Sequence, residues 1–152
     1  MDGLSEIILT SSLTIIGGVI IYSITQLISR FVIEPIYRQK KVIGEIVDAL
    51  IFYANIYSNP NTVSPEDGMK VSERLRRLST LLQSRTYLVP FYGFCEIVGC
   101  VRRRSDIEIA SKEIIGLSNS IIVPTGKEAE YVKHNLERRD KIIQALDLKV
   151  SL

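Results

Sequence analysis

"IILTSSLTIIGGVIIYSITQLIS", residues 7–29, contains no charged side chain over 23 positions. As an α-helix rising 1.5 Å per residue, this segment is about 34 Å long, enough to cross the roughly 30 Å hydrocarbon core of a bilayer. A soluble domain built from the remaining residues is too small to enclose such a helix on every side. A cleaved signal peptide would begin with basic residues, whereas this chain begins with Asp2 and Glu6. The segment therefore predicts a transmembrane helix that stays in the mature protein.

The charges around this segment predict its orientation. All 19 Lys and Arg residues lie at or after Arg30, and basic residues favour the cytoplasmic side of a membrane helix. We therefore expect residues 1–33 to form an N-terminal tail and transmembrane helix with its N-terminus outside. Residues 34–152 are expected to form a cytosolic helical domain, in a plan that suits a small bacterial inner-membrane protein. The formal net charge of +2 is too small for a dedicated nucleic-acid binder. The predicted membrane helix makes the lipid bilayer an expected partner.

One face of the predicted membrane helix carries small and hydroxyl side chains. They recur at steps of three or four residues, so a helix places them on one side: Ser11, Thr14, Gly18, Tyr22, Thr25 and Ser29. Small residues let two helices approach closely, and hydroxyl groups can bond across them. This pattern predicts a self-association face and a homo-oligomer. The alternative is that the hydroxyl groups bond back to their own helical turn.

The segment after the membrane helix begins with a break signal and continues as an amphipathic helix. Pro35 disfavours the α conformation at Glu34, which predicts a kink or short break there. Beyond it, apolar residues recur every seven positions, as in a helix packed within a bundle: Ile36, Ile43, Leu50 and Tyr57. A loop follows, and Ser64 then offers an N-cap, with Pro65 at the first helical position of the next helix.

Three further helices are predicted in the C-terminal part. The first has a core face of Val71, Leu75, Leu78 and Leu82. Capping boxes at 105–108 ("SDIE") and 125–128 ("TGKE") predict helix starts at Ser105 and Thr125. The last helix has a predicted core stripe of Ala129, Val132, Leu136, Ile143 and Leu146. The predicted fold class is all-α: one N-terminal transmembrane helix followed by a small cytosolic bundle of about four helices, with one additional short apolar element.

Two groups of basic residues are candidates for contact with an anionic ligand or anionic lipid. The first lies on one side of a predicted helix, and the second is an unbroken run of arginines; together they comprise Lys70, Arg74, Arg77, Arg102, Arg103 and Arg104. On the helix, Glu66 and Glu73 stand four residues before Lys70 and Arg77, which is the favourable arrangement for intrahelical ion pairs. A solvated, salt-bridged face is therefore the simpler interpretation of the first group.

The stretch "YLVPFYGFCEIVGCVRRR", residues 87–104, is too short to span a bilayer as a helix. Two interpretations remain. The stretch can be a short helix in the core of the bundle, which needs aromatic residues. Alternatively it lies in the plane of the membrane interface, with four aromatic rings at headgroup level and the arginines on anionic lipid: Tyr87, Phe91, Tyr92 and Phe94. Burial in the core is the interpretation we favour from the sequence.

Motifs for catalysis and for cofactor or metal binding are missing from the sequence. Cys95 and Cys100 do not form a C-x-x-C pair, and His134 is the single histidine, so the ligands of a zinc site are lacking. No Gly-rich phosphate loop and no G-x-S-x-G segment occurs. We therefore expect no catalytic, cofactor-binding or metal-binding residues.

The sequence leads to two functional hypotheses. The first is a non-enzymatic, single-pass, membrane-anchored helical module that self-associates and presents a cytosolic surface to a protein partner. The alternative is a ligand-gated membrane effector. In that case the cytosolic bundle would bind an anionic small ligand, such as a nucleotide, and the transmembrane helices would permeabilise the bilayer.

Overall fold

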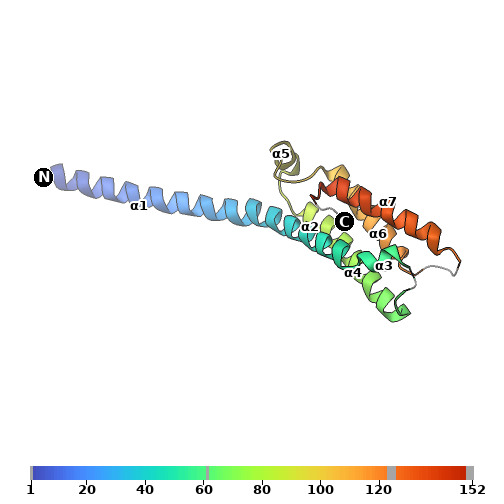
Figure 1. Ribbon diagram of the computed structural model, residues 1–152. Coiled ribbons are helices and arrows are strands. Elements are labelled where there is room, and N and C mark those ends of the chain that lie inside the picture. The colour runs from blue at the N-terminus through green and yellow to red at the C-terminus, as the bar shows by residue number, and fades with distance from the viewer. Residues whose placement is uncertain (1, 61, 123–125, 150–152) are drawn as a thin grey trace.

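The computed structural model describes residues 2–60, 62–122 and 126–149, and within these residues it contains helices and no strand (Figure 1). The elements are α1 (Asp2–Ile28), η1 (Ser29–Ile33), α2 (Glu34–Phe52), α3 (Ala54–Ser58), α4 (Pro65–Tyr87), α5 (Tyr92–Ile97), α6 (Arg104–Asn119) and α7 (Glu128–Leu146). The predicted all-α class is confirmed: one long apolar N-terminal helix leads into a helical bundle.

The first three elements form one uninterrupted helix. It runs from Gly3 to Phe52, 50 residues, and its apolar N-terminal part is long and apolar enough to cross a membrane. No part of that apolar segment is buried by the rest of the chain. In Figure 1 it extends away from the bundle as a rod, and the same helix continues as α2 into the packed domain.

Of the kink or short break predicted at Glu34, the break is wrong, because the helix continues through this residue. Glu34 is helical, with φ −62° and ψ −45°, and its N–H donates to the carbonyl oxygen of Ser29, five residues back. Ser29–Ile33 thus forms a π-helical turn. Such a turn inserts one extra residue into the helix, which changes the hydrogen-bond pattern just before Pro35. The proline is accommodated by this local widening, so the helix distorts without ending.

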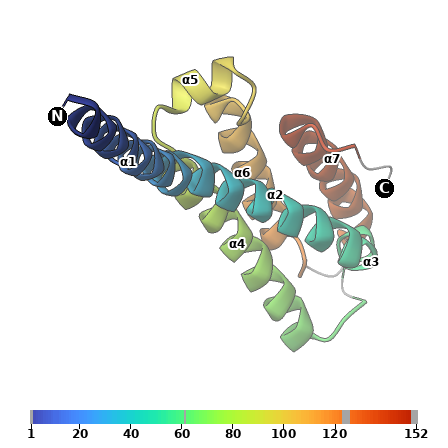
Figure 2. The ribbon, with the colours of Figure 1, turned by 90° about the vertical axis from the view of Figure 1, so that its left-hand side faces the viewer.

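The bundle is built from α2, α4, α6 and α7. Helix α6 packs against both α4 and α7, while α2 packs on α4 and the short α3 on α7 (Figure 2). The predicted core face of α4 is confirmed, because Val71, Leu75, Leu78 and Leu82 are all buried. The main core also includes Ile46, Leu50, Ile107, Ile114, Leu117 and Ile142. These side chains close one apolar core between the four longer helices.

The predicted helix starts have different outcomes. Ser64 is the N-cap of α4, and its side chain accepts a hydrogen bond from the N–H of Asp67 at 3.2 Å, as expected. The predicted N-cap at Ser105 is wrong: α6 begins at Arg104, after Arg103, and the Ser105 hydroxyl contacts Asp106. Thr125 lies outside the described residues. The extended backbone of Arg103, φ −58° and ψ 142°, sets the start of α6 before Ser105 is reached.

The core stripe of α7 is offset from the predicted one. Leu146 is buried as expected, but Ala129 is exposed, and Val132, Leu136 and Ile143 are half-buried. The central buried positions are instead Ile142 and the polar Asn135. The Asn135 amide donates to the carbonyl oxygen of Tyr57 at 2.9 Å, and its Oδ1 accepts from the Ser120 hydroxyl. These bonds satisfy the buried amide, and α7 is oriented with Asn135 toward the core.

Candidate functional site

The most distinctive surface of the bundle is the outer face of α5 and its flanking turns. Phe91, Phe94 and Ile97 are 79%, 68% and 86% exposed, and Leu88 and Val98 are also exposed. The favoured prediction that this stretch is buried is therefore wrong for Phe94 and Phe91. It holds for Tyr92 and Cys95, which face inward. Tyr87, the fourth predicted interfacial aromatic residue, is exposed as well.

The inner face of α5 is held by a small second cluster. Val89, Tyr92, Cys95 and Val101 are buried together, with Ile36 and Cys100 packed against them. The Tyr92 hydroxyl donates to the carbonyl oxygen of Arg102 at 2.6 Å. This bond ties α5 to the start of α6, and burial raises the pKa of Tyr92 above its ordinary value of 10.0. The cluster attaches α5 to α2, next to the π-helical turn.

Gln39 joins this cluster to the bundle and was missed by sequence reasoning. Its side chain is buried, and its Nε2 donates to Thr86 Oγ1 at 2.8 Å and to the Tyr92 hydroxyl at 3.2 Å. The amide oxygen, Oε1, is buried and has no hydrogen-bond partner among the described residues. A signal was present in the sequence, since Gln39 lies three residues after Ile36 and four before Ile43, on the predicted apolar stripe.

The six basic candidates do not form one site. Lys70 near the start of α4 pairs with Glu66 at 2.8 Å, as predicted, and Arg74 lies 3.4 Å from Glu45. In the second group, Arg102 pairs with Asp147 at the end of α7. The remaining candidates have no carboxylate partner in the described part of the chain: Arg77, Arg103 and Arg104. No carboxylate of the described residues therefore competes with an external anion for these three guanidinium groups.

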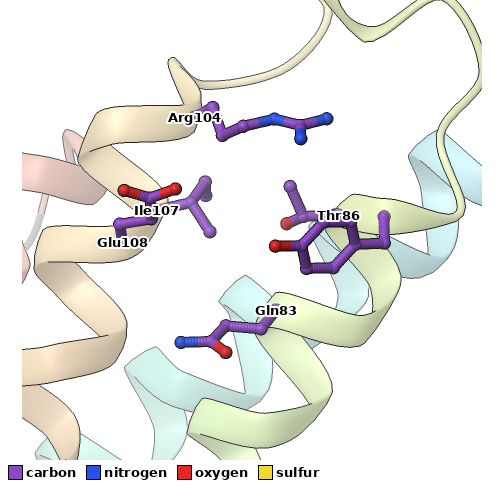
Figure 3. Close-up of a pocket in the computed structure, with 6 residues that line it drawn as sticks. Gln83, Thr86, Arg104, Ile107 and Glu108 are labelled. Carbon is purple, nitrogen blue, oxygen red and sulfur yellow. The ribbon is translucent and has the colours of Figure 1, made fainter.

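Arg104 lies over two aromatic rings at the end of the bundle that α1 enters. Its guanidinium carbon is 5.4 Å from the centre of the Tyr87 ring and 5.0 Å from that of Tyr92, distances at which a cation is attracted to the ring face. It also borders a pocket of about 230 Å³ between the end of α4 and the start of α6. Figure 3 shows Arg104, Ile107 and Glu108 from α6 facing Gln83 and Thr86 from α4 across this pocket.

A larger groove of about 740 Å³ lies between the start of α2, the α5–α6 connection and the end of α7. Its charged lining is balanced, with Lys40, Arg102 and Arg103 against Glu96, Asp106 and Asp147. The groove therefore has no net charge that would select an anion over a cation. Gln39 also lines it.

The predicted association face of α1 is open along the rod. A Cβ added at Gly18 would have no atom within 4 Å. The hydroxyl groups of Thr14 and Thr25 each donate to the carbonyl oxygen four residues back, at 2.8 Å. Hydroxyl donors satisfied in this way are not the driving force for helix association, so any association through this face depends on close packing at Gly18.

Within the part of the chain that the structure describes, no three His, Cys, Asp or Glu side chains gather in a way that could hold a metal ion. Cys95 and Cys100 are free thiols, and His134 is exposed on α7. Comparison of the chain with protein-family models, with characterised proteins and with solved structures finds no match.

Proposed function

We propose that the protein is a non-enzymatic, single-pass membrane-anchored helical module that holds its bundle in a fixed orientation at the cytoplasmic face of a bilayer. The observation that carries this proposal is the unbroken helix Gly3–Phe52, whose first half is apolar and unburied. Its second half contributes Val42, Ile46, Ala49 and Leu50 to the core. An anchor that continues as a core helix cannot swivel freely, so the bundle presents the same surfaces to the cytosol.

The cytosolic surface for a protein partner is expected at the end of the bundle far from the anchor. There, Met69 and Ile122 are exposed and border a groove of about 630 Å³ between α4 and α6. Glu66, Lys70, Glu73 and Arg76 surround these apolar side chains. An apolar centre with a charged rim is the usual composition of a protein interface.

The topology is tested with reporters on the full chain. Because every Lys and Arg lies at or after Arg30, a reporter fused after Leu152 should be active in the cytoplasm and inactive outside. The same reporter inserted before Met1 should show the opposite behaviour. An external C-terminal reporter would refute the proposed orientation.

Self-association through the face Ser11, Thr14, Gly18, Tyr22, Thr25 and Ser29 belongs to the same proposal. Gly18→Leu should weaken oligomers of the full chain in mild detergent, since a large side chain blocks close approach of two helices. Gly17→Leu is the matched control, because the adjacent position points about 100° away on a helix. A wild-type monomer, or an equal effect of both substitutions, would remove this part of the proposal.

A ligand-gated membrane effector is the second candidate. It is favoured by Arg104, whose unpaired guanidinium borders a pocket at the anchor end of the bundle. A small anion bound there would act close to a helix that enters the membrane without a break. Expression of the full chain with a potential-sensitive dye separates the candidates. Depolarisation that is lost when residues 1–33 are removed would replace the first proposal, whereas an unchanged membrane potential would retain it.

A further inference from the structure

We propose that α5 is a second membrane contact, lying in the headgroup region of the same leaflet that α1 leaves. In this arrangement Leu88, Phe91, Phe94, Ile97 and Val98 enter the boundary between headgroups and acyl chains. The proposal rests on the membrane anchor proposed above and adds to it a defined surface of the bundle that touches lipid.

The first argument is the contrast between the two faces of α5. In six residues this helix buries Tyr92 and Cys95 on one side and exposes Phe94 and Ile97 on the other. Phe91, just before it, has a left-handed backbone, φ 48°, and its carbonyl oxygen accepts from the N–H groups of Phe94 and Cys95. A bulky residue in the left-handed conformation raises the free energy of the folded backbone, and the surrounding structure must offset this strain. In this strained conformation the Phe91 ring is exposed on the surface.

The second argument is the position of this face. In both ribbon views α5 lies beside the junction of the rod and the bundle (Figures 1 and 2). Its cluster packs on Ile36, which is seven residues, or about 10 Å of helix, beyond Ser29. Between these positions the long helix exposes Phe31 and Ile33, and it exposes Tyr37 directly after Ile36. Exposed apolar and aromatic side chains therefore occur on the long helix between its apolar segment and the level of α5. Aromatic residues are enriched at bilayer interfaces.

The third argument is the charge around the face. Arg103 and Arg104 are exposed, and neither side chain has a carboxylate partner in the described residues. Arg104 lies over the Tyr87 and Tyr92 rings, and both cations can meet lipid phosphates. The acidic residue of α5, Glu96, is half-buried, and its Oε2 accepts from the N–H of Arg104 at 3.4 Å. The carboxylate is thus directed toward the start of α6 and away from the outer face. A single such contact is weak, but the anchor keeps the face close to lipid and raises its effective concentration.

The experiment uses tryptophan, which the chain lacks entirely. Phe94→Trp places one fluorophore on the proposed contact, and Ile97→Trp places one beside it. Phe52→Trp is the matched control: Phe52 is 75% exposed, like Phe94, but lies at the far end of α2. Ile20→Trp reports on the anchor itself. Each full-length variant is reconstituted into vesicles of phosphatidylcholine and phosphatidylglycerol, with and without brominated acyl chains, and titrated with aqueous iodide.

The expected result is a blue-shifted emission from Trp at positions 94 and 97, with most of its intensity lost in brominated vesicles and little lost to iodide. Trp at position 52 should show the reverse. Quenching by iodide alone at both positions 94 and 97 would overturn the proposal, because the face would then be in water. Protection of both positions from iodide and from bromine would also overturn it and would indicate that protein covers α5. Absence of bromine quenching at position 20 would refute the membrane anchor, whereas quenching at 20 without quenching at 94 and 97 would refute only the second contact.

Discussion

The bundle core and the α5 region are both rich in apolar side chains, yet they end in different environments. In the core, side chains from α2, α4, α6 and α7 meet from several directions, and Leu78, Leu82 and Leu117 are fully buried. In the α5 region, four residues are buried against α2 while the outer face stays open. Apolar content alone does not decide burial; the number of elements that surround a segment does.

The polar groups of the two regions differ in the same way. In the core, the Ser79 and Ser111 hydroxyl groups lie 2.6 Å apart and also reach each other's carbonyl oxygens. At the α5 junction, Gln39 has a buried oxygen without a partner in the described residues. The two core serines have hydrogen-bond partners, whereas the junction at α5 contains a buried oxygen that lacks one. We therefore expect substitutions in the core to lower the free energy of unfolding more than substitutions in the α5 region.

Leu78→Ala tests the closed region and should have the largest effect. Leu78 is fully buried at the centre of α4, and such truncations cost about 2–5 kcal/mol through lost burial and a residual cavity. The free energy of unfolding would be measured by urea titration of the full chain in detergent, followed by circular dichroism. Leu88→Ala, an exposed leucine at the end of the same helix, is the control. Equal costs for both leucines would show that the core is not the closed region described here.

Asn135→Ala tests the polar bonds of the core. The substitution removes the amide that donates to the Tyr57 carbonyl oxygen, whereas the Ser120 hydroxyl still reaches the carbonyl oxygens of Gly116 and Leu117. Leaving a buried acceptor unsatisfied costs about 1–3 kcal/mol. The neighbouring exposed residue gives the control, since His134→Ala should change the free energy of unfolding by less than about 0.5 kcal/mol. If both variants unfolded at the same urea concentration, Asn135 would not be a core residue.

Sequence reasoning succeeded where one local pattern has one physical solution. The length of the apolar N-terminal segment, the leucine face of α4 and the Ser64 cap all follow from spacing within a few turns. It failed where the outcome depends on residues far apart. Asn135 is polar and lies outside the predicted core stripe of α7, but partners in α3 and at the end of α6 hold it inside.

The aromatic composition of residues 87–104 predicts burial of Phe94, but sequence spacing does not reveal whether another helix covers α5. Distant contacts, not local propensities, decided the positions of Asn135 and Phe94. Glu34 differs, because the proline rule predicts a disturbance there and the local π-helical turn supplies it without a break.

Tyr92→Phe tests how firmly α5 is attached. It removes the donor to the Arg102 carbonyl and an acceptor for Gln39, so we expect a loss of about 1 kcal/mol. Hydrogen exchange of residues 92–102 should accelerate, while exchange in α4 stays unchanged. Tyr87→Phe, at an exposed ring, should alter neither. Faster exchange throughout the bundle would mean that the two regions unfold as one.

Because burial raises the pKa of Tyr92, the stability that its phenol contributes should depend on pH. Burial favours the neutral phenol in the folded state, so the stability it contributes is complete below the ordinary pKa of 10.0 and is lost as pH rises through the folded-state pKa. The difference in exchange between the wild type and Tyr92→Phe should therefore shrink at alkaline pH. A difference that grew with pH would contradict the proposed role of the neutral hydroxyl group.

Phe94→Ala should have the smallest effect on folding. A buried phenylalanine would lose about 3–5 kcal/mol on truncation, but a side chain that is 68% exposed should change the free energy of unfolding by less than about 0.5 kcal/mol. Phe52→Ala, at another exposed phenylalanine, should have a similarly small effect in detergent. In anionic vesicles the two variants should differ if the proposed lipid contact forms, because of the two residues only Phe94 belongs to the proposed contact. Loss of the Phe94 ring should then increase hydrogen exchange of residues 88–98. A loss of several kcal/mol in detergent would instead place Phe94 in a packed core, and an identical exchange pattern for both variants in vesicles would leave α5 exposed to water.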